Sequence, residues 1–126
     1  MVRLNRAIPI VFTSDVTKSA AFYRDSLGFS IDFLHGDPPF YGSVTRDGAT
    51  MHVKFVHDPV ITPGPQERDG FITVFVEVED VTTLFDQCRA ASVDIAQALE
   101  EHAWGWTDFV VRDPDGNMIC FGARTS

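Results

Sequence analysis

Two stretches of the chain decide its fold: residues 13–33, "TSDVTKSAAFYRDSLGFSIDF", and residues 77–97, "EVEDVTTLFDQCRAASVDIAQ". They align on the tripeptide Asp-Val-Thr. In each stretch the Asp, Asp15 or Asp80, stands where an N-cap side chain accepts hydrogen bonds from the free amides of a helix. A strand-like run precedes each cap, at residues 7–12 and 71–78, and an amphipathic helix and a further strand follow it. The chain therefore contains an internal repeat.

Each repeat continues into a β-hairpin. Residues 41–56 turn at Arg46-Asp47-Gly48, and residues 106–122 turn between Asp113 and Gly116. Each repeat is thus predicted to be a βαβββ module, with module one at about residues 6–57 and module two at about 71–123. The Pro- and Gly-rich residues 57–70 are the predicted linker. Because one module cannot cover its own sheet, we expect both to form a single α+β domain, residues 1–126, around a shared core.

Bulk properties exclude several function classes. The net charge of −8 argues against nucleic-acid binding, which needs a basic face. No apolar run approaches the roughly 18 residues that span a bilayer, and no signal peptide is recognisable. Two cysteines fit a reducing compartment better than a disulfide scaffold. The expectation is a cytoplasmic protein with neither a membrane nor a nucleic acid as partner.

The motifs resemble those of one superfamily. Residues 15–29 follow the pattern D-x-x-x-S-x-x-F-Y-x-x-x-L-G-F, and "WGWTDFVVRDPDGN" (104–117) is similar to a W-G…D-P-x-G-N stretch. With the tandem βαβββ order, they resemble the vicinal oxygen chelate superfamily of glyoxalases, dioxygenases and bleomycin resistance proteins, the last branch above all. The resemblance covers residues 7–122. It implies that the mixed sheets form a half-open funnel, and that a homodimer binds its ligand in grooves at the dimer interface.

Catalytic members of that superfamily hold a divalent metal with His, Gln and Glu ligands. The resemblance carries these four positions onto Ile8, His52, Phe71 and Cys120. Ile8 and Phe71 have no donor atom, and two donors are too few for a stable catalytic site. Lys54 shares the strand face of His52 and would repel a cation. We therefore predict no metal, no cofactor and no catalytic residue. Cys120 as a reactive thiol would need a lowered pKa, for which Lys54 or His52 could supply charge; a buried, unreactive cysteine is the alternative.

The same funnel without a metal would be an aromatic pocket. Trp104 and Trp106 lie at an entry from loop to strand, and "PPFYG" (38–42) is a similar entry. Aromatic faces with acids nearby suit a planar or cationic guest through stacking and cation–π attraction. Covering a dimer interface is the alternative role of these rings. The segment "EEH" (100–102) is interpreted as a solvated turn. The predicted ligand-binding residues are Phe40, Tyr41, His52, Phe71, Trp104, Trp106, Asp108 and Cys120.

Three functional hypotheses follow. The first is a homodimer that sequesters a small, bleomycin-like molecule, cationic or aromatic, without transforming it. The alternative is a metal-dependent glyoxalase- or dioxygenase-like enzyme in which His52 is the retained metal ligand and the other ligands are displaced to new positions. The third is a structural or regulatory dimer with a closed funnel.

Overall fold

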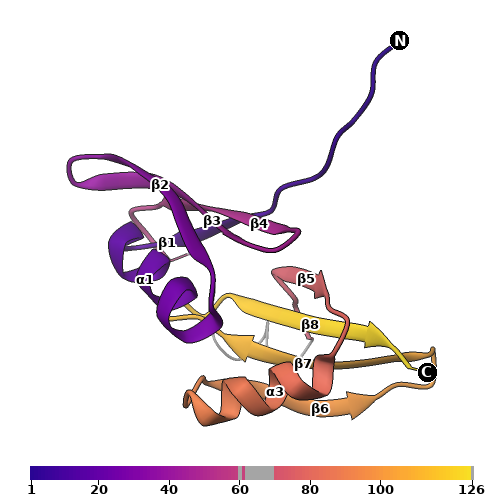
Figure 1. Ribbon diagram of the computed structural model, residues 1–126. Helices are drawn as coiled ribbons and strands as arrows, with labels where there is room; N and C mark the ends of the chain where they lie inside the picture. The colour runs from indigo at the N-terminus through magenta and orange to yellow at the C-terminus, as the bar shows by residue number, and fades with distance from the viewer. Residues whose placement is uncertain (60, 62–69, 126) are drawn as a thin grey trace.

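The computed structural model describes residues 1–59, 61 and 70–125. Module one follows the predicted order of one strand, one helix and three strands (Figure 1). Its elements are β1 (Ile10–Thr13), α1 (Val16–Leu27), β2 (Ser30–Gly36), β3 (Pro39–Arg46) and β4 (Ala49–Phe55).

Module two repeats this order. It comprises β5 (Val74–Glu77), α3 (Val81–Ala90), β6 (Ile95–Glu101), β7 (Trp106–Arg112) and β8 (Met118–Arg124). The strand predicted at residues 71–78 is shorter than expected, because pairing with β8 begins only at Val74. Residues 60 and 62–69 of the predicted linker lie outside the described residues.

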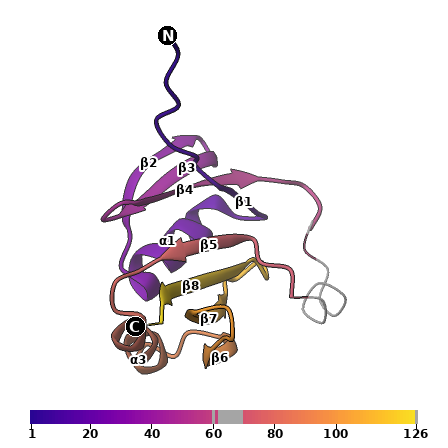
Figure 2. The ribbon, with the colours of Figure 1, turned by 90° about the vertical axis from the view of Figure 1, so that its right-hand side faces the viewer.

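Each module forms one four-stranded mixed sheet. The strand orders, β1-β4-β3-β2 and β5-β8-β7-β6, are equivalent, with one parallel pair at the edge and two antiparallel pairs. Figure 2 shows the two sheets one above the other, with α1 between them. The predicted α+β architecture of two βαβββ modules is confirmed. The two helices in the described chain have 12 and 10 residues, too short to cross a membrane.

Both helices begin at the predicted caps. Asp15 accepts a hydrogen bond from the Lys18 amide, and Asp80 accepts one from the Thr83 amide, each at 3.1 Å. Helix α1 ends at Gly28, whose φ of 74° is the left-handed conformation that glycine adopts without strain. The local signals therefore fix where each helix starts and where α1 stops.

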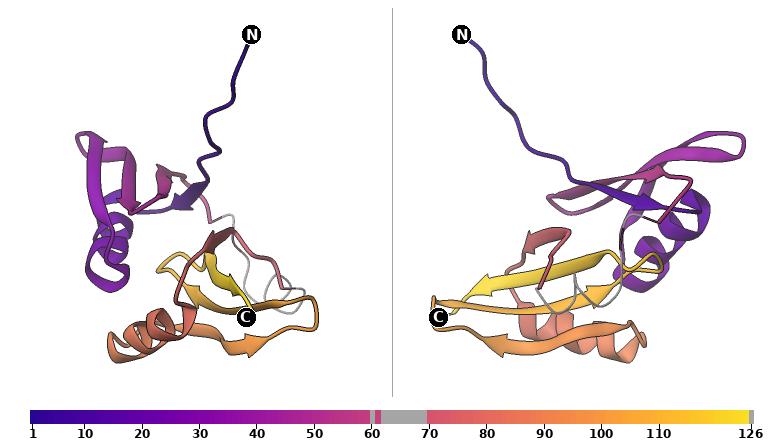
Figure 3. Two further views of the ribbon diagram at one scale, coloured as in Figure 1. Left: turned by 45° about the vertical axis from the view of Figure 1, so that its right-hand side comes forward. Right: turned by 180° about the vertical axis from the view of Figure 1, so that it is seen from behind.

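The helix-covered faces of both sheets meet in one hydrophobic core. Val44 and Val53 from module one and Phe109 and Ile119 from module two are fully buried in this cluster. The opposite face of each sheet lies outside it. The N-terminal end of the segment before β1 extends away from the body of the molecule (Figures 1 and 3), whereas Arg6 and Pro9 are hydrogen-bonded to Thr50 and His52 of β4.

The β7–β8 turn joins the modules. Asp113 accepts a 2.7 Å hydrogen bond from the Tyr23 hydroxyl of α1, and Asn117 Nδ2 donates to the Phe12 carbonyl at 2.9 Å. Asp115 accepts a hydrogen bond from the Ser14 amide. The "DPDGN" segment thus has a structural role: it docks the second module onto β1 and α1 of the first.

Candidate ligand-binding faces

The module-one face that lies outside the core carries a polar and aromatic cluster. The Tyr41 hydroxyl of β3 lies 2.9 Å from Nδ1 of His52 in β4. The Phe33 ring meets the His52 ring edge-on, with 6.2 Å between centroids. The half-buried imidazole is therefore bordered by two aromatic rings.

Hydroxyl groups and one carboxylate continue this face. Asp32 of β2 accepts hydrogen bonds from Thr45 at 2.6 Å and Ser43 at 2.8 Å. These hydrogen bonds hold the pKa of Asp32 below its usual value, so that it is ionised at neutral pH. Arg6 donates to Thr50 beside them. This half of the surface offers hydroxyls and charges of both signs, from Asp32, Arg6 and Lys54, to a polar ligand.

The corresponding face of module two is organised around Asp108, which is only 8% exposed. Its Oδ1 accepts a 2.7 Å hydrogen bond from Gln97 Nε2 and lies 2.7 Å from His102 Nε2. The Cys120 thiol is also hydrogen-bonded to Asp108. Burial, together with this negative charge, raises the pKa of Cys120 to about 12. The thiol is therefore protonated at physiological pH and unreactive.

Aromatic rings border this second face. The Trp106 ring meets the Phe75 ring edge-on at 5.6 Å and carries the Arg124 guanidinium at 5.2 Å from its centroid. Trp104 lies in the turn after β6 and stacks on His102, with 4.3 Å between centroids and 9° between planes. Trp104 is nevertheless 71% exposed. Trp106 thus already has internal partners, whereas Trp104 has one ring face covered by imidazole and the other open to solvent.

Comparison with known proteins identifies the family. The model of the Glyoxalase/Bleomycin resistance protein/Dioxygenase superfamily matches residues 3–121. The chain belongs to this superfamily. Bleomycin resistance proteins from Geobacillus stearothermophilus and Staphylococcus aureus are each 27% identical to it over 127 residues, covering 92% of this chain and 94% of the relative.

Solved structures of superfamily members confirm the fold. The bleomycin-binding protein of Streptomyces verticillus, complexed with copper(II)-bleomycin, is 26% identical, with a TM-score of 0.74 over 100% of this chain and 99% of that chain. A second bleomycin-binding protein, complexed with bleomycin, has a TM-score of 0.77 at 21% identity, covering 96% and 99% of the two chains. The predicted branch is therefore confirmed: this superfamily member is similar to bleomycin resistance proteins.

The residues beside His52 and Cys120 do not form a ligand set like that of the catalytic, metal-binding superfamily members. The parallel pairs place Ile10 across from His52 and Phe75 across from Cys120, and neither apolar side chain has a donor atom. Among the described residues, no group of three or more His, Cys, Asp or Glu could hold a metal ion. The residues present do not fit a resident metal.

Several predicted positions differ from expectation. Ile8 and Phe71 lie before β1 and β5 rather than in them, so Ile10 and Phe75 occupy the places beside His52 and Cys120. Phe40 contacts the ring of His35 where the pairing register of β2 and β3 shifts, and not the ring of His52 as Tyr41 does.

The chemical environments of Asp108 and Cys120 are now defined. Asp108 is not a free acid facing a cationic guest, because Gln97, His102 and Cys120 all contact its carboxylate. Of the two alternatives for Cys120, the structure favours the buried, unreactive cysteine: the group beside its thiol is the Asp108 carboxylate rather than Lys54 or His52, and it raises the pKa of Cys120.

Sequence reasoning missed His102, Gln97 and Phe33. The "EEH" segment is not a solvated turn at His102, whose side chain is only 13% exposed. No local signal identifies His102 as a partner of Asp108, because that contact depends on the register of the β6–β7 hairpin. The repeat does contain a signal for Phe75, since aligning Asp15 with Asp80 also aligns Ile10 with Phe75.

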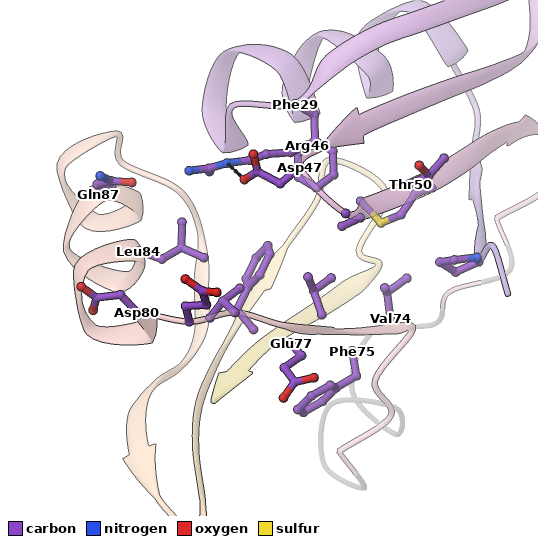
Figure 4. A pocket seen from close by; sticks show the side chains of 18 of the residues that line it. Phe29, Arg46, Asp47, Thr50, Val74, Phe75, Glu77, Asp80, Leu84 and Gln87 are labelled. Atoms are coloured by element: carbon purple, nitrogen blue, oxygen red, sulfur yellow. Dashed lines mark ion pairs between the residues drawn. The ribbon is translucent and has the colours of Figure 1, made fainter. Parts of the chain in front are cut away.

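A cavity of about 880 Å³ lies between the β3–β4 turn, β5 and α3 (Figure 4), and it shares Thr50 and Phe75 with the two faces described above. The two-residue turn Asp47-Gly48 is shorter than the β7–β8 turn that packs against α1, which leaves this space against α3. None of the eight predicted ligand-binding residues lines it. Apolar side chains and carboxylates contribute to its wall, among them Phe29, Met51, Leu84, Phe121, Asp47, Glu77, Glu79 and Asp80.

Proposed function

We propose that the chain binds a bleomycin-like ligand, both aromatic and cationic, and holds it without transforming it. The observation that carries this proposal is the Trp104 indole, held flat against His102 on one side and open on the other. An indole in this state is a ready stacking surface for a planar group. Its 27% identical relatives bear the name bleomycin resistance protein, which supports the ligand class.

The charge of the protein favours a cationic guest. The net charge is −8, and the ionised Asp32 lies on the hydroxyl-rich face of module one, which also carries the basic side chains of Lys54 and Arg6. A negative surface raises the local concentration of cations and steers their approach. The proposed ligand-contacting residues are therefore Trp104 on module two and Tyr41, His52 and Asp32 on module one.

We also propose that the chain acts as a cytoplasmic homodimer. Val2 and Leu4 in the extended N-terminal segment are each 91% exposed, and exposed apolar side chains favour association. The free thiols of Cys88 and Cys120 suit a reducing compartment. Sedimentation velocity should give twice the mass of the chain, and deletion of residues 1–6 should weaken the dimer. A monomeric full-length chain would contradict the proposal.

Calorimetric titration tests the ligand. Metal-free bleomycin and copper(II)-bleomycin should both bind, and Trp104→Ala should raise Kd about tenfold or more, as loss of an aromatic anchor usually does. Arg24→Ala, on the exposed side of α1, is the control and should bind as wild type. If neither compound gives heat or a thermal shift with the wild type, a structural or regulatory dimer becomes the better reading.

Metal analysis tests the enzymatic alternative. Protein purified without chelators should contain no stoichiometric divalent metal, and bleomycin recovered after incubation should have an unchanged mass. Stoichiometric metal that disappears in His52→Ala would show that His52 is a ligand after all and would overturn the proposal.

A further inference from the structure

The Trp104 ring is connected to the buried part of module two through a single side chain. Asp108, in the middle of the sheet face, is hydrogen-bonded to Nε2 of His102 at 2.7 Å. The imidazole of His102 in turn covers one face of the Trp104 indole. A carboxylate can only accept, so the imidazole must donate through Nε2. That bond fixes the plane of the imidazole, and the imidazole fixes the plane of the indole.

The backbone hydrogen bonds of the turn do not fix the orientation of the indole, so this orientation depends on the contact between Trp104 and His102. The His102 amide donates to the Trp106 carbonyl, and the Gly105 amide donates to the His102 carbonyl. Gly105 adopts a φ of 89°, and its carbonyl accepts from Thr125. These bonds close the turn around Trp104 and set the direction of its Cα–Cβ bond. An indole that is 71% exposed would otherwise rotate freely about its side-chain torsions.

We propose that Asp108 and His102 are positioning residues that hold Trp104 in the orientation against which a planar ligand stacks. This inference rests on the proposed function, because it concerns the same indole. Neither residue needs to touch the ligand: Asp108 is buried, and His102 lies beneath the indole. Their contribution is to order Trp104 before binding, so that the ligand does not have to do so.

Ordering one large side chain in advance corresponds to a change in Kd of about 3- to 10-fold. We therefore expect His102→Ala to raise the Kd for bleomycin by that factor. The effect should be smaller than that of Trp104→Ala, which removes the stacking surface itself. Asp108→Asn, which removes the charge but keeps the shape, should lie between wild type and His102→Ala.

Fluorescence of the ligand-free protein separates positioning from general destabilisation. The chain has two tryptophans, so Trp106→Phe leaves Trp104 as the only indole. In this background, His102→Ala should lower the steady-state anisotropy of Trp104 and increase its quenching by acrylamide. Arg24→Ala, on the exposed side of α1 in the other module, is the control in the same background. It should change neither the fluorescence nor the Kd.

The outcomes distinguish the two proposals. If Trp104→Ala weakens bleomycin binding while His102→Ala and Asp108→Asn bind as wild type, the positioning role is refuted and the proposed function stands. If wild type does not bind, the proposed function fails, and the anisotropy alone then decides whether His102 holds the indole. Unchanged anisotropy in His102→Ala, with a folded protein by circular dichroism, would overturn the inference whatever the ligand.

Discussion

Replacing Tyr23 with Phe tests how the two modules are held together. The Tyr23 ring is fully buried, and its hydroxyl donates a 2.7 Å hydrogen bond to Oδ2 of Asp113 in the other module. The same carboxylate accepts from Asn117 Nδ2 and from the amides of Asp115 and Asn117. Burial raises the pKa of Asp113, although these hydrogen bonds oppose the effect. The substitution removes one donor from a carboxylate that is already poorly solvated.

The expected loss follows from that single bond. A hydrogen bond to a charged group contributes roughly 1.5–3 kcal/mol, and Phe keeps the packing of the ring. We expect the free energy of unfolding at pH 7.5 to fall by about 2 kcal/mol. For a domain of this size, that is a decrease in Tm of roughly 6–12 °C.

The loss should depend on pH. Because its native pKa is raised, Asp113 favours the native state below its unfolded pKa of about 3.9, and this contribution is lost as the pH rises through the native pKa. Removing the Tyr23 hydroxyl raises that native pKa further. The difference in unfolding free energy between the Tyr23→Phe variant and wild type should therefore be largest at pH 7.5 and should shrink as the pH falls, because a growing fraction of Asp113 is then protonated in both proteins.

Urea unfolding followed by circular dichroism at pH 7.5 and 4.5 measures both effects. Tyr41→Phe is the matched control at pH 7.5, because its half-buried hydroxyl contacts His52 rather than a buried carboxylate, and it should cost about 0.5–1 kcal/mol. The reasoning fails if Tyr23→Phe costs no more than this control, or if its cost is the same at both pH values.

Three further predictions concern single positions. Gly28→Ala should cost about 1–2 kcal/mol in urea unfolding, since Gly28 has a φ of 74°. Gly48→Ala should change stability by less than about 0.5 kcal/mol, because the added Cβ would lie in open space. Asp80→Ala should cost about 1 kcal/mol in the same assay through loss of the α3 N-cap; no loss would show that the cap is redundant. Neither Cys88 nor Cys120 should react with a disulfide reagent at pH 8 until the chain is denatured, because burial raises the pKa of both thiols; one fast-reacting thiol per native chain would contradict this.

The order of the elements could be predicted because its signals are local. The N-caps Asp15 and Asp80 can each be recognised from the residues of one helical turn, and each β-hairpin turn can be recognised from a few adjacent residues. The length of β5 could not be read in this way. Phe71 and Ile72 continue the apolar run of the strand, yet pairing with β8 starts at Val74, and that limit is set by a partner more than 40 residues away.

The candidate site was harder to predict, because it depends on which side chains meet across strands. Alternation correctly indicated that His52 and Lys54 share a strand face, but it could not show that the Tyr41 hydroxyl reaches His52. Asp108 illustrates the limit most clearly. The sequence indicated Asp108 as a ligand-binding acid beside the aromatic residues; across the β6–β7 hairpin it is instead the buried partner of Gln97 and His102.

The two faces differ in chemistry, and this difference bears on the proposed dimer. Module one presents hydroxyls and the ionised Asp32, while module two presents Trp104 and its support. Because the helix-covered sides of both sheets meet in one core, these faces lie on the outside of a single chain. A ligand that is cationic at one end and planar at the other could use both surfaces if a second copy brought its module two opposite module one of the first. On this reasoning, bleomycin affinity should fall when the protein is diluted below the dimer dissociation constant, and dimerisation and ligand binding should be lost together when residues 1–6 are removed.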